Sequence, residues 1–346
     1  MANLKPFNGI RYNPEKAGDI ATLISQPYDR VRHGLQEKYY DLNDYNVVRM
    51  IKGKEFEDDH VNENVYTRAR NFLSKWLAEG VLKYEEKPAI YVYHQEFTLN
   101  GETVVRKALI GALELARFEE GIVLPHEKTH DGPKMDRLML TRTTQAYYGN
   151  IFILYPDAQN KVDAILDAAV QREPDVDVRE LFEKDVRQML WVVTDEEVLA
   201  AVQAEFAPKN GLIIADGHHR YETAITYRDE QREKFPNAPE DAAFNYLLVA
   251  LVSMSNPGLT ILPTHRLIFD YKQMSVDDVL AKAAEYFEID KVVDRVALEA
   301  RMDSKVGEMG SFGIVTKSGV YALDLKSATV MEALAPSRKK SWQTLD

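Results

Sequence analysis

A strand–turn–helix pattern at Gly211–Ala224 (GLIIADGHHRYETA) constrains the fold of this chain more than any other stretch. Leu212–Ala215 is a short apolar run of the kind that forms a buried strand. Asp216-Gly217 is a turn pair, and its glycine can take backbone angles that are closed to other residues. From His218 onward, apolar side chains recur at spacings of three and four, which predicts an amphipathic helix. We therefore expect a tight turn between a core strand and a helix.

The predicted turn is rich in ionisable side chains, which are those of Asp216, His218, His219, Arg220 and Glu222. The first turn of a helix leaves amide N–H groups unpaired, and its dipole favours anions. We expect Arg220, with His218 and His219, to form a cradle for a phosphate or carboxylate. Asp216 and Glu222 are candidate metal ligands and, with His218, candidate catalytic residues. The structural alternative is that Asp216 caps the helix and the other charges are solvated.

A second polar stretch, Ile122–Arg142, has the side chains of His126, Glu127, His130, Lys134, Asp136 and Arg137. Its HEKTH string matches the zinc-protease pattern HExxH, which binds metal only when both histidines lie on one helix. Pro125 before it and Asp131-Gly132-Pro133 after it indicate a loop instead, with a helix from about Met135. We expect His126 and Glu127 to contact substrate, and Lys134 and Arg137 to bind an anionic cofactor.

Two further residues are candidates for substrate binding. Asp29 follows Pro27-Tyr28 in an extended or turn segment, where the structural alternative is an ion pair with Arg30 in solvent. His265 follows an apolar run, where site residues of α/β proteins often lie. The segment Asn46–Ile51 is expected to be a strand with Arg49 near its middle.

The remaining pattern predicts a mixed α/β or α+β fold with at least two sheets and flanking helices. Val61–Gly80 has a helical apolar stripe, and Ala89–Leu99 with Val104–Leu115 forms a hairpin about Asn100-Gly101. A second hairpin is expected at 310–325. We expect a domain boundary near Ala207, which gives regions 1–207 and 208–346, or else one intertwined domain.

Composition excludes several classes of protein. The 346 residues include 43 Lys plus Arg and 55 Asp plus Glu, so the formal net charge is −12, which argues against a nucleic-acid partner. No apolar run approaches the roughly 20 residues that span a bilayer, and the first residues do not resemble a signal segment, so no membrane partner is expected. The chain has no cysteine, which excludes disulfides and thiolate chemistry. A cytoplasmic location is the expectation.

Several separate motifs carry a resemblance to a known family. The strings PYDRV, NVVRM, LPHEKTHDGPKMDRL, ADGHHRYETA and LPTHRL occur in this order. Together they resemble a bacterial and archaeal family classed as domain of unknown function 1015, over Pro6 to about Leu325. The string DGHHRYETA is also similar to the G-x-H-R helix start of the ParB and sulfiredoxin superfamily, which binds nucleotide phosphates and includes kinases of free serine. This resemblance implies a phosphate-binding turn formed by Gly217, His219 and Arg220.

Three functions are consistent with these observations. The first is a phosphotransferase that uses ATP or ADP with Mg²⁺ on a small hydroxylated metabolite, with L-serine as one candidate. The second is a metal-dependent hydrolase of a phosphoester or amide, with His126, His130, His218 and Asp216 as ligands. The third is a nucleotide sensor without catalysis. All three predict that the loop at 126–137 meets the turn at 216–222.

Overall fold

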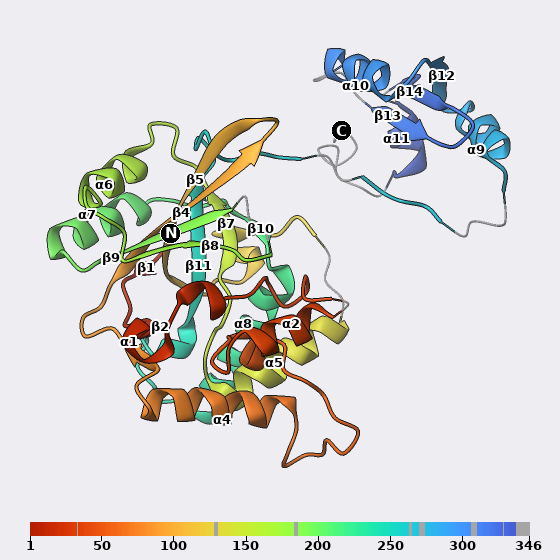
Figure 1. The fold of residues 1–346 in the computed structure, drawn as a ribbon. Helices are drawn as coiled ribbons and strands as arrows, with labels where there is room; N and C mark the ends of the chain where they lie inside the picture. Colours follow the sequence, from red (N-terminus) through yellow and green to blue (C-terminus); the bar gives the residue numbers. More distant parts are fainter. Residues whose placement is uncertain are drawn as a thin grey trace. The chain divides into compact units, whose positions relative to one another are not determined.

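The computed structural model describes residues 1–32, 34–127, 131–182, 186–262, 265–269, 274–305, 310–327 and 329–336, without the side chains of Asp131 and Pro133. The chain divides into two compact units, Met1–Ile261 and Leu262–Asp346 (Figure 1). Each unit is described by itself.

The first unit is organised around a mixed sheet in the order β6-β10-β7-β11-β5-β4-β9-β8, with β1 paired to β5. β10 is parallel to β6, and β11 is parallel to β7, whereas the other neighbours are antiparallel. The strands are β1 (Leu4–Lys5), β4 (Ile90–Leu99), β5 (Glu102–Glu114), β6 (Val123–Leu124), β7 (Ile151–Tyr155), β8 (Val176–Arg179), β9 (Arg187–Val193), β10 (Leu212–Asp216) and β11 (Tyr246–Ser253). The expected hairpin at 89–115 is confirmed as β4–β5.

Helices pack on this sheet through apolar residues at helical spacing. The main core joins alternate strand residues to Val162 of α6 (Lys161–Ala169), Phe206 of α7 (Glu196–Phe206) and Tyr221 of α8 (His218–Lys234). These three side chains are completely buried. Helix α8 therefore begins at the sheet and is anchored to it by its first turns.

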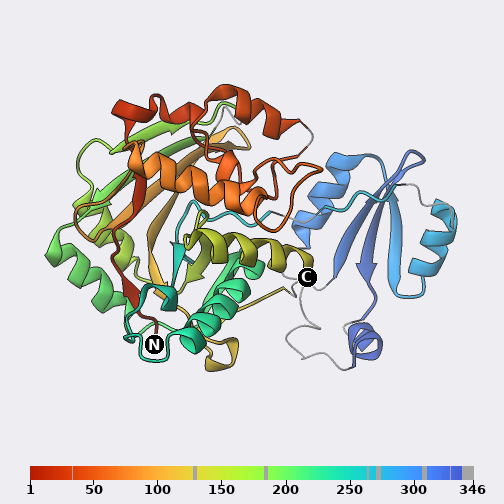
Figure 2. The same cartoon turned by 90° about the horizontal axis from the view of Figure 1, so that it is seen from below.

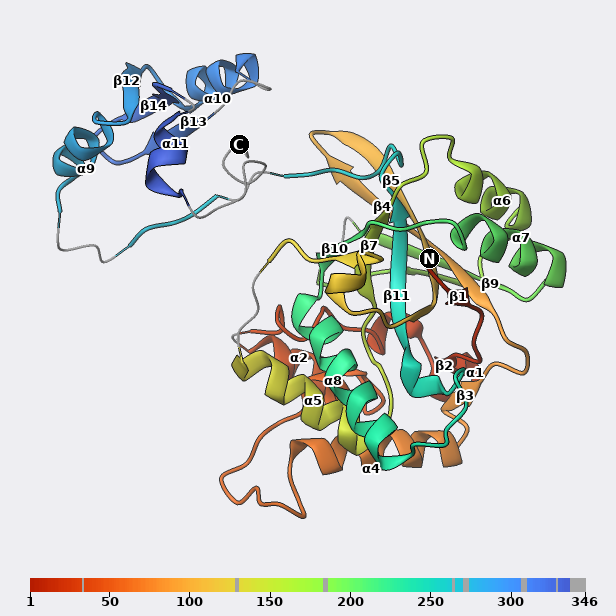
Figure 3. The same cartoon turned by 180° about the vertical axis from the view of Figure 1, so that it is seen from behind.

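Helix α5 (Asp131–Thr144) lies between α8 and α4 (Val65–Ala78), and Figures 2 and 3 show α5 and α8 side by side. A second core cluster around Trp76 joins α4 and α5 to the N-terminal segments. Those segments include β2 (Ile10–Tyr12), α1 (Pro14–Ala17), α2 (Leu35–Leu42), α3 (Val48–Ile51) and β3 (Leu82–Tyr84), with β2 and β3 forming a two-stranded sheet. The loop–helix segment at 122–144 is thus held between α8 and the N-terminal part of the chain.

The second unit contains a three-stranded antiparallel sheet in the order β12-β14-β13. Its elements are α9 (Val276–Ala283), β12 (Phe287–Val292), α10 (Arg295–Ser304), β13 (Ser311–Val315), β14 (Val320–Leu325) and α11 (Thr329–Leu334). Leu298 of α10 packs over Gly313, where a β-carbon would come within 2.6 Å of it. The second hairpin and the mixed fold with more than one sheet are confirmed.

Three expectations about the fold are wrong. The boundary near Ala207 does not exist, because β10 and β11, which follow it, pair with β7 and β5 in one sheet. The segment Asn46–Ile51 is not a strand but contains α3, because the Asn46 side chain accepts a hydrogen bond from the Val48 amide and starts a helical turn. Helix α5 starts before Met135, at Asp131.

Within the described residues, no helix combines enough length with enough apolar character to cross a bilayer. The expected cytoplasmic location stays a prediction.

Candidate functional site

The candidate site is built on the turn between β10 and α8. The pairing of β10 with β7 shifts register between Ile214 and Asp216, so the strand ends in an irregular ladder, as often occurs beside functional sites. Gly217 then takes a φ of 100°, and α8 starts at His218 without a side-chain cap. Asp216 therefore does not cap the helix, and the glycine makes the turn because other residues resist this backbone conformation.

The Arg220 side chain folds back over this turn. Its Nη2 lies 2.6 Å from Asp216 Oδ2, and its Nη1 donates to the Asn150 carbonyl at 2.5 Å. A β-carbon on Gly217 would lie 3.0–3.2 Å from the guanidinium, and one on Gly149 would lie 3.1 Å from Nη1. The two glycines thus leave room for the guanidinium. Because only 21% of the Arg220 side chain is exposed, it is a pre-oriented cation at the start of α8.

The loop after β6 contacts the turn, which confirms the predicted meeting of the two polar stretches. The His126 amide donates to His218 Nε2 at 3.2 Å, and His126 Nδ1 lies 2.7 Å from the Ile214 carbonyl. The two imidazole rings meet edge to face, with centroids 4.5 Å apart. Because a carbonyl only accepts, His126 Nδ1 carries a proton, and the Nε2 of the neutral ring keeps its lone pair.

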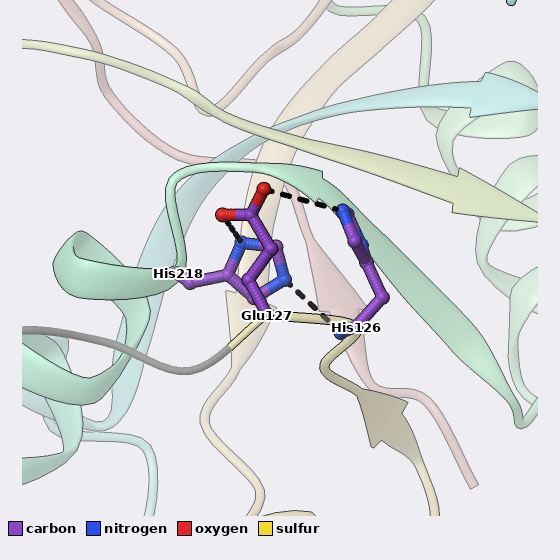
Figure 4. A group of neighbouring side chains, drawn as sticks. All are labelled: His126, Glu127 and His218. Carbon is purple, nitrogen blue, oxygen red and sulfur yellow. Dashed lines mark hydrogen bonds and ion pairs between the residues drawn. The ribbon is translucent and has the colours of Figure 1, made fainter. Parts of the chain in front are cut away.

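Glu127 lies between the two histidines (Figure 4). Its Oε1 is 3.8 Å from His126 Nε2, and its Oε2 is 3.7 Å from His218 Nδ1. The side chains of His126 and Glu127 are 48% and 64% exposed, whereas only 2% of the His218 side chain is exposed. Burial and, secondarily, the neighbouring His126 lower the pKa of His218, although Glu127 acts in the opposite direction. His218 is therefore neutral at neutral pH.

An ion pair between Lys134 of α5 and Glu222 of α8 continues the site along the helix pair. Each side chain is 29% exposed. The Thr223 hydroxyl donates to the Lys134 carbonyl at 3.4 Å and to the His219 carbonyl at 2.6 Å. Lys134 thus lies in the first turn of α5 and beside the first turns of α8.

Arg137 lies on α5, one turn after Lys134. Its Nη2 is 2.6 Å from Asp136 Oδ2, its Nη1 donates to the Ile51 carbonyl at 3.1 Å, and its guanidinium lies 4.1 Å from the centre of the Tyr28 ring. Burial raises the pKa of Tyr28, while the positive charges of Arg137 and Arg220 both oppose that increase. Tyr28 therefore lies within the electrostatic influence of both arginines.

Tyr28 was not among the site residues predicted from the sequence, whereas its neighbour Asp29 was. Asp29 is exposed, and its backbone carbonyl accepts from Arg32 Nε at 3.1 Å. The aromatic ring in the PYDRV string was the signal that could have identified Tyr28, because arginines commonly stack on aromatic faces.

Two predicted residues lie outside the described part of the first unit. His265 is exposed and belongs to the second unit, so its role in substrate binding stays a prediction. His130 lies outside the described residues, as does its proposed role as a metal ligand. Of the hydrolase ligands, His126 and His218 are brought together, whereas the Asp216 carboxylate pairs with Arg220.

Comparisons with known proteins identify a family without a known activity. Residues 4–346 match the family described as "Protein of unknown function (DUF1015)". No curated protein and no solved structure matches the chain. The similarity of the α8 turn to ParB and sulfiredoxin proteins stays a resemblance.

Proposed function

The chain belongs to the DUF1015 family of proteins of unknown function, and we propose that it is a nucleotide- and Mg²⁺-dependent phosphotransferase acting on a small hydroxylated metabolite. The observation that carries this proposal is the presence of two cations at the first turns of α8, Arg220 on the helix itself and Lys134 on the neighbouring α5. Free L-serine is the first acceptor to test, because of the resemblance of DGHHRYETA to a superfamily that includes free serine kinases. The donor is ATP or ADP.

The α8 turn has the features that bind nucleotide phosphates. Gly217 brings the backbone close to a ligand without a side chain, and the start of the helix favours negative charge. Arg220 can offer two parallel N–H groups to phosphate oxygens, and Lys134 offers a point charge. We assign Gly217, His219, Arg220 and Lys134 to the phosphates, with Arg137 at the edge of the site.

Each of the two cations is paired with a carboxylate, Arg220 with Asp216 and Lys134 with Glu222. A bound phosphate would compete for both cations and leave the carboxylates available. Carboxylates are the ligands that Mg²⁺ prefers, so we assign Asp216 and Glu222 to the metal. The bound Mg²⁺ would neutralise charge on the phosphates.

The transfer step needs a base for the acceptor hydroxyl. We propose that one of the two carboxylates, Asp216 or Glu222, takes the hydroxyl proton. The hydroxyl oxygen then bonds to the terminal phosphorus as the bond from that phosphorus to the bridging oxygen breaks. The electron pair leaves with the nucleotide, as ADP from ATP or as AMP from ADP.

We assign the loop residues His126 and Glu127 to the acceptor, because both are partly exposed beside the turn. His218 is buried, and its ring nitrogens face the His126 amide and Glu127. We therefore assign His218 the role of positioning the loop against α8. Asp29 and His265 remain candidates for substrate contact.

The direct test is product formation by the purified chain. We expect phosphoserine, detected by mass spectrometry, from L-serine with ATP or ADP only when Mg²⁺ is present. Arg220→Ala is expected to lower kcat/KM by about 10²-fold or more, as loss of a charged group that stabilises a transition state does.

Arg142→Ala is the matched control. Arg142 lies on α5 and forms an ion pair with Glu230 of α8, 2.5 Å apart. Its variant therefore removes an arginine between the same two helices but leaves the turn at Gly217 unchanged. An unchanged rate in Arg220→Ala would remove the turn from the chemistry. Nucleotide binding without product from a panel of hydroxylated acceptors would favour the sensor. Cleavage of phosphoesters or amides without nucleotide would favour the hydrolase.

A further inference from the structure

We infer that His126, Glu127 and His218 form a binding site for a divalent first-row transition metal, with Zn²⁺ as the expected ion. One ligand atom from each of the three residues lies within 4.8 Å of the others. This site uses none of the carboxylates assigned to Mg²⁺ above. It also does not depend on the proposed phosphotransferase, because none of its three side chains is assigned to the nucleotide or to Mg²⁺.

The first ligand, His126, is already oriented for metal binding. Its Nδ1–H donates to the Ile214 carbonyl at 2.7 Å, which leaves the Nε2 lone pair facing Glu127. A backbone carbonyl that holds the second nitrogen is the usual support of a metal-binding histidine, because it fixes the ring and its tautomer. The carbonyl comes from β10, a strand inside the sheet, so the support is rigid.

The donor set discriminates between metals. Two imidazoles and one carboxylate suit Zn²⁺ and its first-row neighbours, whereas Mg²⁺ prefers oxygen ligands alone. Around Zn²⁺, neighbouring donors in a tetrahedron lie about 3.3 Å apart, as follows from metal–nitrogen bonds of about 2.0–2.1 Å. The separations of 3.7 Å and 3.8 Å from Glu127 to the two rings exceed this by about half an ångström. The exposed Glu127 side chain can close these two separations, whereas the two histidine donors, which lie within 4.8 Å of each other, approach through the loop that carries His126.

The site is open to solvent on one side. His126 and Glu127 are partly exposed, whereas His218 closes the buried side. Three protein ligands with an open position are typical of catalytic rather than structural zinc sites. The pairing also differs from the HExxH pattern, because His126 meets a histidine 92 positions away on another element.

Metal binding is coupled to the loop. His218 Nε2 accepts the His126 amide hydrogen at 3.2 Å, so the proton of the neutral ring is on Nδ1. A metal at Nδ1 requires this proton to move to Nε2, where it would oppose the amide N–H. Binding of the ion therefore breaks the hydrogen bond from the His126 amide to His218 Nε2, and the His126 backbone must shift when the ion binds.

The test is metal binding by the full chain after chelator treatment, measured without nucleotide or substrate. We expect one equivalent of Zn²⁺ after equilibrium dialysis, and visible Co²⁺ absorption bands of a site with nitrogen ligands. His126→Ala and Glu127→Gln change exposed side chains, so both are expected to fold, and each is expected to weaken Zn²⁺ binding at least tenfold. His60→Ala, which removes an exposed histidine outside the cluster, is expected to bind as the wild type does.

Two results would overturn the site: less than half an equivalent of Zn²⁺ in the folded wild type, or unchanged affinity in both His126→Ala and Glu127→Gln. Neither result bears on the phosphotransferase, whose test uses Mg²⁺, nucleotide and Arg220→Ala.

Discussion

At the scale of single residues, the position of Arg220 depends on two glycines. Gly217 and Gly149 border its guanidinium, and a β-carbon on either would approach it to within about 3.0–3.2 Å. Only Gly217 also has a positive φ, so a side chain there strains the backbone as well. Alanine variants at the two positions therefore distinguish the effect of displacing the Arg220 guanidinium from the effect of straining the turn.

We predict that Gly217→Ala and Gly149→Ala both weaken nucleotide binding, because each displaces the Arg220 side chain. Only Gly217→Ala is expected to lower the free energy of unfolding by a further ~1–2 kcal/mol, the cost of left-handed backbone for a residue with a β-carbon. Calorimetric titration and urea unfolding measure the two effects. Wild-type nucleotide affinity in Gly149→Ala would show that the position of Arg220 does not matter.

His94 on β4 gives a prediction about pH. Its Nε2 is buried without a hydrogen-bond partner in the described residues, and its ring meets Trp191 edge to face at 4.9 Å. Burial first, and the positive charge of Lys107 second, lower the pKa of His94, while Asp167 acts in the opposite direction. The unfolded chain therefore binds a proton at higher pH than the folded chain does.

It follows that His94 makes stability fall as the pH drops below about 6.5, the ordinary histidine value. We predict that His94→Phe, which keeps a ring against Trp191, loses less stability than the wild type between about pH 6.5 and pH 5. Urea unfolding of both proteins across this pH range measures the change in the free energy of unfolding. Parallel pH profiles of the two proteins would contradict the assignment.

The candidate residues could be identified from the sequence only where they are close together in the chain. Asp216–Glu222 and His126–Arg137 are clusters of ionisable residues at turns, and the structure brings them into contact. Tyr28 could not be placed, because its approach to Arg137 depends on tertiary packing across more than 100 residues.

At the scale of elements, the hydroxyl of Tyr221 joins α8 to the end of a sheet strand. The buried Tyr221 hydroxyl donates to the Ala116 carbonyl at 2.8 Å and accepts from the Ala116 amide at 3.2 Å. These groups follow β5, so this pair of hydrogen bonds fixes the start of α8 relative to the sheet. Without the hydroxyl, two buried backbone groups lose their partner.

We predict that Tyr221→Phe lowers the free energy of unfolding by about 1–3 kcal/mol, the cost of leaving buried polar groups unpaired. Tyr227→Phe is the control, because Tyr227 lies on the same helix and its hydroxyl makes no hydrogen bond within the described residues. Urea unfolding measures the free energy of unfolding of both variants. Equal stability of the two variants would show that these hydrogen bonds contribute little.

Most elements could be predicted because their local pattern agrees with their tertiary setting. The β4–β5 hairpin has alternating residues and an Asn-Gly turn, and α8 has apolar residues at helical spacing. The segment Asn46–Ile51 was wrongly predicted to be a strand, because its β-branched residues favour strands. In the structure the Asn46 side chain donates hydrogen bonds to the carbonyls of Thr22 and Ile24, which hold the backbone in a turn. These partners lie more than 20 positions away, beyond a local pattern.

At the scale of the whole molecule, the proposed site belongs to the first unit. The main core cluster, from Ala2 to Leu251, lies entirely within Met1–Ile261. We predict that a chain ending at Ile261 folds, as judged by a cooperative unfolding transition, and binds nucleotide as the full chain does. Retained turnover in this fragment would also exclude His265 from the substrate site.

The boundary of the two units could not be read from composition. Ala207 precedes a polar segment, yet β10 after it returns to the sheet between β6 and β7. Strand order depends on pairing between distant segments, which a local pattern does not specify.

The claim that the α8 turn binds nucleotide phosphates is tested most directly by thermal unfolding with ATP, ADP, GTP, CTP and SAM, with and without Mg²⁺. A ligand at 100 times its Kd stabilises a folded protein by about 2.7 kcal/mol, which raises Tm measurably. We predict an increase in Tm with ATP or ADP that needs Mg²⁺, is lost in Arg220→Ala and is kept in Arg142→Ala. No increase with any nucleotide in the folded wild type, or an equal increase in Arg220→Ala, would contradict this account.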